Sequence, residues 1–264
     1  MVSSMSIIIE KQQNVCIWTE AGVLNNKLCD RDFHCEQCPL DAALRDHSDT
    51  CREEEPDLEY VDLPLIMDEE LPEHVKPLLA PFRSLTICTD LRYSSRHVWI
   101  RLLPTGMVRC GLDAFAAALL PDDSQIVVLA NRSFVREGEE FGWVYGGNNA
   151  IPLSAPVSGT VVCRNMDLLY ATDSVRTRPY EKGCIVTLAP EVGALATARL
   201  SSPRNHIRRI RRRGRDLNDR LRKLMTSPEL GLCLNDGGEP VSSIEELFGE
   251  QRYWELLRKF VGGE

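Results

Sequence analysis

Short apolar runs rich in β-branched and aromatic residues follow one another through the middle of the chain, separated by Gly, Pro, Asn and Asp. They cover residues 97–103, 107–111, 126–129, 141–145, 160–164 and 184–188. Regularly spaced short strands with turn signals between them indicate a β-barrel or a β-sandwich. One helical turn is expected at 113–120, because this stretch is rich in helix formers and stops before Pro121.

Size and composition are ordinary for a soluble protein. The 264 residues and the 43% hydrophobic content suffice for one sizeable core with smaller satellites. No stretch approaches the ~18 apolar residues that a membrane span needs, and the first residues lack the basic and apolar regions of a signal peptide. We therefore expect a cytoplasmic protein without membrane contact, whose ten cysteines are thiols or metal ligands rather than disulfides.

Charge is strongly separated along the chain. The formal net charge of -8 argues against nonspecific nucleic-acid binding by the whole protein. Acidic residues are concentrated in 46–73 and basic residues in 204–223. The acidic connector, 46–83, is predicted to be a solvated spacer with short helical turns, and a specific acidic docking site is the alternative.

The N-terminal segment, residues 1–45, carries four cysteines as potential soft metal ligands: Cys16, Cys29, Cys35 and Cys38. The two-residue gap between Cys35 and Cys38 lets both sulfurs face one ion. Zn²⁺ accepts four thiolates in a tetrahedron, and its binding would order a segment too small to fold by burial alone. A helix is expected to begin at Pro39, directly after the last ligand.

Other interpretations of these cysteines stay open. An iron–sulfur cluster uses the same thiolates, and the four side chains could also be unmetallated thiols. His34 and Cys51 are spare ligand candidates. The cysteines in or beside predicted strands are expected to be small buried apolar residues: Cys88, Cys110, Cys163 and Cys184.

The last segment, 193–264, is predicted to be helical. Ser202 and Pro203 form a capping residue followed by proline, so a helix should run from there to about Met225. Its apolar residues fall on three- and four-residue steps and line one face: Ile207, Ile210, Gly214, Leu217, Leu221 and Leu224. That face could pack on the barrel, or on a second copy in a homodimer through 203–225. A second helical unit is expected at 244–261.

The same helix carries a run of arginines: Arg208, Arg209, Arg211, Arg212, Arg213 and Arg215. With the apolar face buried, most of them should lie on the outer face and keep the helix soluble. Pairing with the acidic connector or with an acidic partner is the next interpretation. Nucleic acid is disfavoured, because no aromatic residues alternate with the arginines for base stacking.

No enzyme constellation is visible. The five histidines are scattered along the chain, and there is no nucleophile elbow, phosphate loop or His-Glu-x-x-His pair. His97 is expected to serve the opening strand of the barrel. These observations predict a protein without catalytic activity.

Five segments between Tyr93 and Pro190 together resemble the glycine cleavage system H-protein family. They are 93–99 (YSSRHVW), 111–116 (GLDAFA), 135–142 (VREGEEFG), 155–159 (APVSG) and 178–184 (RPYEKGC), in the order that the family has them. The resemblance implies a fold that is mainly β with α, a barrel-sandwich hybrid like a lipoyl domain, over 84–192.

In this family a lysine at a hairpin tip carries lipoate, and the resemblance places Asn148 at that position, in the sequence Gly146-Gly147-Asn148-Asn149. An amide nitrogen is not a usable nucleophile, and the chain has no lysine between Lys76 and Lys182. We therefore expect no covalent lipoate, although Gly and Asn still favour a tight turn.

These expectations converge on a non-enzymatic adaptor or regulator that binds protein partners of unknown identity. A first alternative is a redox or metal-sensing protein that uses the barrel as a scaffold. A second is participation in glycine cleavage or lipoate metabolism through the docking surface of the family, for example as a decoy whose hairpin tip enters an enzyme cavity without a lipoyl group.

Overall fold

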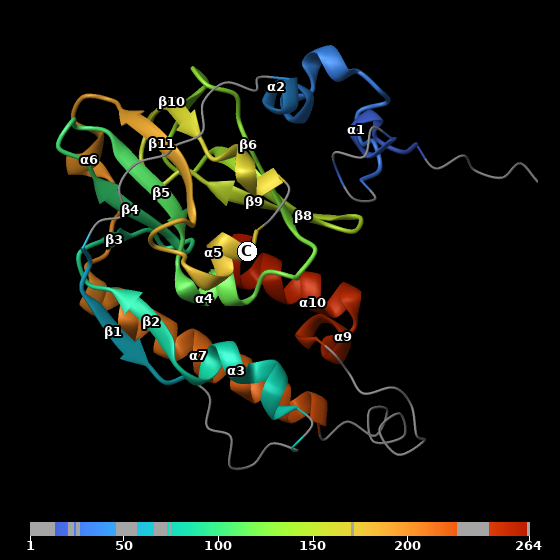
Figure 1. The fold of residues 1–264 in the computed structure, drawn as a ribbon, viewed down its shortest axis with the longest axis vertical. Helices are drawn as coiled ribbons and strands as arrows, with labels where there is room; N and C mark the ends of the chain where they lie inside the picture. The colour runs from blue at the N-terminus through green and yellow to red at the C-terminus, as the bar shows by residue number, and fades with distance from the viewer. Residues whose placement is uncertain are drawn as a thin grey trace, which may run out of the picture.

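The computed structural model describes residues 14–20, 24, 27–45, 57–65, 73, 75–169, 172–225 and 243–262. Cys51, His47 and His74, and with them much of the acidic connector, lie outside these ranges. Two antiparallel sheets form the centre of the molecule, with helices around them (Figure 1).

The larger sheet has six strands in the order β3-β4-β5-β11-β10-β7. Their bounds are β3 Arg92–Tyr93, β4 Val98–Leu102, β5 Val108–Leu112, β11 Cys184–Pro190, β10 Gly159–Arg164 and β7 Phe134–Val135. The smaller sheet has the order β6-β8-β9, with β6 Gln125–Val128, β8 Glu140–Gly146 and β9 Asn149–Ser154. All six predicted strands are therefore confirmed, within one or two residues at their ends.

The predicted helical turn is α4, Ala114–Ala118, and Asp113 caps it by accepting a hydrogen bond from the Ala116 amide at 2.8 Å. Two further short helices follow the strands, η4 Met166–Leu169 and α5 Asp173–Thr177. After β11 the chain forms α6, Ala194–Thr197, and then turns into the long helix α7.

Helix α7 runs from Pro203 to Met225, as predicted. Its apolar side is buried within the chain, since Ile210, Leu217 and Leu221 are all fully covered. A Cβ on Gly214 would lie 3.0 Å from a methyl carbon of Leu65, so the connector packs closely there. The face considered for a homodimer is thus occupied by the chain itself.

The connector is more structured than a solvated spacer. Strand β1, Tyr60–Leu63, pairs with β2, Leu85–Cys88, in a two-stranded sheet. Between them lie η3, Lys76–Leu79, and α3, Ala80–Arg83. The expectation of a spacer is wrong for this part, because four of its side chains are buried in the core: Leu63, Val75, Leu79 and Phe82.

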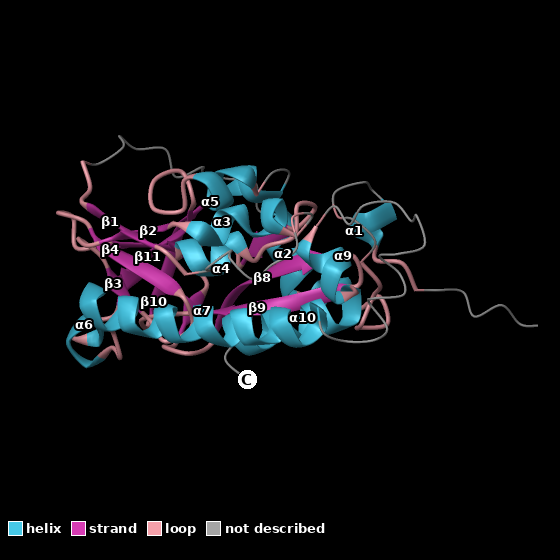
Figure 2. Ribbon diagram, turned by 90° about the horizontal axis from the view of Figure 1, so that it is seen from below, coloured by secondary structure: helices cyan, strands magenta, loops and turns pink. Residues whose placement is uncertain are grey.

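The N-terminal segment contains α1, Ile17–Glu20, η1, Cys35–Gln37, and α2, Pro39–Arg45, which begins at the predicted proline. The C-terminal unit is α9, Ile244–Phe248, α10, Glu250–Leu257, and η5, Arg258–Gly262. In Figure 2 α7 and α10 lie along one edge of the molecule, and β9 packs against η5. Within the described ranges no helix is both long and apolar enough to cross a bilayer.

The strand cysteines follow the prediction with one exception. Cys88, Cys110 and Cys184 are free and buried. Cys163 is only partly buried and is disulfide-bonded, so the expectation of a buried free thiol is wrong there.

Candidate functional site

The predicted hairpin is present between β8 and β9. Gly146 pairs with Asn149, which leaves Gly147 and Asn148 as the two turn residues. Gly147 has φ +52°, and a positive φ at the first turn position suits a two-residue hairpin and favours glycine there. The Asn148 side chain at the tip is exposed.

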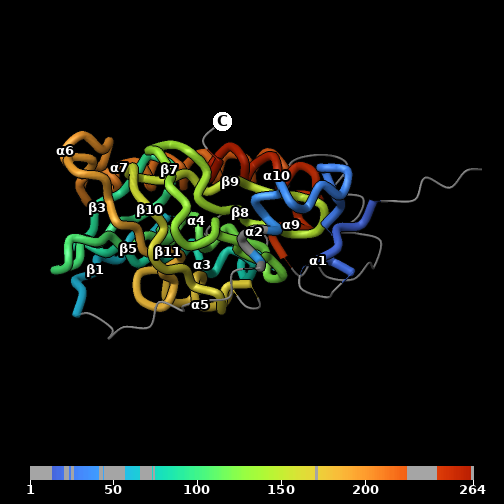
Figure 3. The backbone as a smooth tube through the Cα atoms, turned by 90° about the horizontal axis from the view of Figure 1, so that it is seen from above, coloured from blue at the N-terminus to red at the C-terminus, as the bar shows by residue number. Residues whose placement is uncertain are grey.

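The outer face of the hairpin sheet is covered by the N-terminal segment. Alternation along the strands turns Val127, Trp143, Tyr145 and Ala150 to this face. They contact a small apolar cluster contributed by the segment: Cys16, Leu24, Leu40 and Leu44. Burial raises the pKa of Tyr145, and the Lys27 ammonium lies 5.7 Å from its ring centroid. Helix α2 packs against β6 of this sheet, and in Figure 3 it lies in front of the sheet.

The inner side of the same hairpin is covered by the C-terminal unit. A Cβ on Gly146 would lie 2.5 Å from Cζ2 of Trp254, so the indole occupies the space of the missing side chain. Trp254 is 1% exposed, and its Nε1 donates to Glu245 at 3.0 Å.

Polar contacts fix the strand next to the tip. The Asn149 side-chain nitrogen donates to Glu250 at 3.1 Å, and its oxygen accepts from Arg258 at 3.0 Å. Further along β9, Arg96 donates to both the Ser154 hydroxyl and the Gly262 carbonyl at 2.9 Å. The hairpin is thus held on both faces, while Asn148 itself extends into solvent.

The four predicted ligand cysteines line one cavity in the N-terminal segment. All four are free thiols; Cys16 is buried and the others are partly exposed. Partial burial, Asp41 and the other three thiolates raise the pKa of Cys35. Cys29 accepts a hydrogen bond from the Phe33 amide at 3.2 Å.

These thiols are close together but are not arranged as a finished metal site. Within the part of the chain that the structure describes, no three His, Cys, Asp or Glu side chains are placed so that they could hold an ion. The spare candidate His34 is exposed and lines the same cavity. The donor set suits zinc, and the sulfurs would have to move together to bind it.

Comparison with known proteins identifies the central part of the chain. A family model described as "Glycine cleavage H-protein" matches residues 91–206. The glycine cleavage system H protein of Opitutus terrae is 34% identical over 113 residues, which is 43% of this chain and 89% of that protein. That of Mycobacterium leprae is 35% identical over 113 residues, which is 42% of this chain and 86% of that protein.

The chain belongs to the glycine cleavage H-protein family. A solved H protein from Mycobacterium marinum shares 27% identity with it, covering 43% of this chain and 91% of the other with a TM-score of 0.38. The family match begins after the Cys-rich segment and ends near the start of α7. The two segments that cover the hairpin, the N-terminal segment and the C-terminal unit, therefore lie outside the region shared with the H-protein family.

Within the H-protein region, two histidines meet on one buried carboxylate. His97 Nδ1 lies 2.8 Å from Asp113 Oδ2, and His206 Nε2 lies 3.1 Å from the same oxygen. All three side chains are fully buried, so two histidines that are scattered along the chain meet in the fold. His206 also stacks on Tyr93 with 3.8 Å between ring centroids.

The electrostatics of this cluster favour an ionised Asp113. Burial alone would raise the pKa of Asp113, but the charge and hydrogen bonds of the two histidines outweigh it and hold this pKa well below its ordinary value. Burial lowers the pKa of His206, although its bond to Asp113 opposes the shift. His97 precedes β4 with φ +61°, and the cluster joins β4, α4 and α7 rather than lining a cavity.

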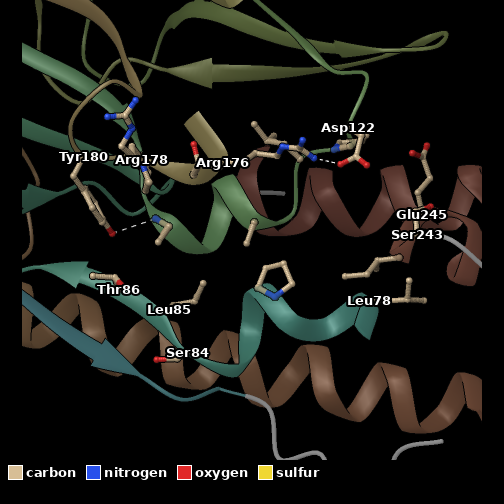
Figure 4. A pocket seen from close by; sticks show the side chains of 18 of the residues that line it. Leu78, Ser84, Leu85, Thr86, Asp122, Arg176, Arg178, Tyr180, Ser243 and Glu245 are labelled. Atoms are coloured by element: carbon tan, nitrogen blue, oxygen red, sulfur yellow. Dashed lines mark hydrogen bonds and ion pairs between the residues drawn. The ribbon is translucent and has the colours of Figure 1, made fainter. Parts of the chain in front are cut away.

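A cavity of about 1090 Å³ lies between α3, α4, α5 and α9 (Figure 4). Arg176 forms ion pairs there with Asp122 and Asp173. The Ser243 hydroxyl caps α9 by accepting from the Glu246 amide at 3.0 Å.

Proposed function

We propose that this member of the H-protein family is a non-enzymatic adaptor or regulator that has lost the acyl-carrier role. The observation that carries the proposal is the exposed hairpin tip, where Asn148 offers an amide instead of the primary amine that lipoylation requires. The covers on both faces of the hairpin support the proposal, because they occupy surfaces that a docking enzyme would have to approach.

Treatment with lipoate ligase and lipoate, followed by intact-mass measurement, tests this proposal. The wild-type protein should keep its mass, whereas Asn148→Lys should gain one lipoyl group if the tip is still recognised. Asn149→Lys is the matched control, since Asn149 is bonded to Glu250 and Arg258 rather than free at the tip. A wild-type protein that gains a lipoyl group would refute the proposal.

We further propose that Cys16, Cys29, Cys35 and Cys38 hold a structural zinc ion. Support comes from their common cavity and from the preference of zinc for thiolates. Elemental analysis of freshly purified protein should find about one zinc per chain, lost in Cys35→Ser but kept in His34→Ala. Retention of zinc by Cys35→Ser would count against this ligand set.

A redox or metal-sensing role is a second candidate, favoured by the position of the thiols over the hairpin sheet. An iron–sulfur cluster would absorb visible light and would yield both iron and sulfide. Zinc alone, with no visible absorption, removes this candidate.

A third candidate is docking on enzymes of glycine cleavage or lipoate metabolism, which the family relationship favours. The partners of the adaptor would then be those enzymes. Addition of the protein to a reconstituted glycine cleavage reaction should change its rate in that case. No change in rate over a range of concentrations disposes of this candidate and leaves an adaptor with other protein partners.

A further inference from the structure

The arginines of α7 from Arg204 to Arg220 fall into two groups. Arg209, Arg213 and Arg220 are partly buried and contact the chain itself. Arg209 donates to the Ser94 carbonyl at 2.6 Å, while Arg213 and Arg220 lie over the ring of Phe260 at 5.3 and 6.0 Å. These inner arginines fasten the helix to the rest of the molecule.

The second group comprises five exposed arginines: Arg204, Arg208, Arg211, Arg212 and Arg215. None of the five forms a hydrogen bond or ion pair with any other residue in the described ranges. Their three- and four-residue spacing puts like charges next to one another on the helix surface, which disfavours the helix. Acidic residues in the described ranges therefore do not neutralise this surface.

Four of the five form a narrow stripe. At about 100° per residue, Arg204, Arg208, Arg211 and Arg215 fall within a sector of about 60° beside the buried face. They extend over about 16 Å of helix. An extended peptide of about five residues spans this length.

A hollow of about 600 Å³ lies at the N-terminal half of the stripe. Arg204, Arg208 and Arg211 line it together with Thr89, Ser202, Pro203 and Ile207. Ile207 and Pro203 add apolar surface to this hollow beside the three arginines. Such a surface suits a ligand that combines negative charge with an apolar group.

We propose that this arginine stripe is the docking surface for an acidic peptide segment of a partner protein, with an apolar side chain entering the hollow. Two observations favour a peptide over a nucleic acid. The net charge of -8 opposes a long polyanion, and the residues that line the hollow include no aromatic ring for base stacking. The inference deepens the adaptor role proposed above by naming its class of partner, and it stands independently of lipoylation and of metal.

Fluorescence anisotropy with the full chain tests the docking surface. The probe is a labelled glutamate-rich peptide of about eight residues with one central leucine, long enough to cover the stripe. The test variant is Arg204→Gln/Arg208→Gln/Arg211→Gln. The matched control, Arg132→Gln/Arg136→Gln/Arg199→Gln, removes the same charge from exposed arginines outside α7.

The wild type and the control should bind the peptide alike, and the test variant should bind roughly tenfold more weakly because three exposed charge contacts are lost. Replacing the leucine of the probe by glutamate should weaken binding to the wild type. An unchanged thermal midpoint shows that the test variant is folded. Absence of binding by the wild type, equal loss in both variants, or tighter binding of an oligothymidylate of the same length would each overturn the proposal.

Discussion

The hairpin of β8 and β9 and the arginine stripe of α7 differ in whether other segments of the chain cover them. The hairpin, which belongs to the H-protein region, is covered on both faces by segments outside the family match. Most of α7 also lies outside the match, yet its arginine stripe is exposed and forms no hydrogen bond or ion pair with other residues in the described ranges. Segments outside the family match thus cover the hairpin and, in α7, present an exposed arginine surface.

Removal of the indole that covers the hairpin should have the largest effect. Trp254→Ala empties a fully buried site against Gly146, and such substitutions cost about 3–5 kcal/mol. Hydrogen exchange of residues 146–149 should accelerate, while the arginine stripe keeps its peptide affinity. Trp18→Ala, a half-buried tryptophan of the N-terminal segment, is the comparison variant. Equal exchange at the hairpin in wild type and Trp254→Ala would show that the cover does not constrain it.

Loss of the buried carboxylate should loosen α7 and with it the stripe. Asp113→Asn removes the charge that both histidines contact, and unmade buried hydrogen bonds of this kind cost about 1–3 kcal/mol or more. Urea denaturation measures the loss. Asp167→Asn, at an exposed acid in η4, should change stability little. A stability equal to wild type would mean that the cluster does not anchor the helix.

The same cluster predicts how stability depends on pH. The pKa of His206 is lowered from 6.5 in the folded state, so its contribution is present above that value and is lost as pH falls through the folded pKa. The pKa of Asp113 is lowered from 3.8, which adds a second loss at still lower pH. Urea midpoints measured from neutral to acidic pH should decline in both windows. His206→Phe should flatten the first window, and an unchanged slope there would contradict the assignment.

Removal of the polar contacts beside the tip should have a small effect. Glu250→Gln/Arg258→Gln weakens the bonds to Asn149, and partly exposed contacts of this kind contribute about 0.2–1 kcal/mol. Hydrogen exchange at residues 147–149 is the sensitive measurement, since global stability will hardly move. If hydrogen exchange in the variant is as slow as in the wild type, Trp254 alone restrains the hairpin tip.

Neutralisation of the stripe should stabilise the helix slightly. Each like-charge pair removed from an exposed helix surface relieves about 0.2–0.5 kcal/mol. Arg204→Gln/Arg208→Gln/Arg211→Gln should therefore unfold at a slightly higher midpoint than wild type at low salt, and the difference should shrink as salt is added. A lower midpoint would show that these arginines have partners within the chain, contrary to the comparison between hairpin and stripe.

Much of the scaffold follows from local sequence. The six predicted strands, the turn at Gly147 and Asn148, and the start of α7 at Pro203 all carry signals within a few residues. Strand β9 carries no such signal, because Pro152 argues against a strand; the sheet tolerates it since β9 lies at an edge. Strand β1 was not predicted from the sequence, because of the acidic residues around it.

The arrangement of the candidate site was less accessible to sequence reasoning. His97, Asp113 and His206 are far apart in the chain, and only tertiary packing brings them together. The expected helix at 113–120 did point to Asp113 as a cap, but the cap residue gives no sign of its two histidines. The covers of the hairpin depend on where the N- and C-terminal segments dock, which periodicity within each segment does not specify.

The place of His206 gives α7 a mechanical property. The contact with Asp113 lies in the first turn of a helix that extends to Met225, and Asp113 also begins α4. A partner bound to the arginines acts on the helix close to this pivot. Tension from such a partner would pass through this carboxylate into the interior of the barrel, in addition to the buried contacts of Ile210, Leu217 and Leu221 further along the helix.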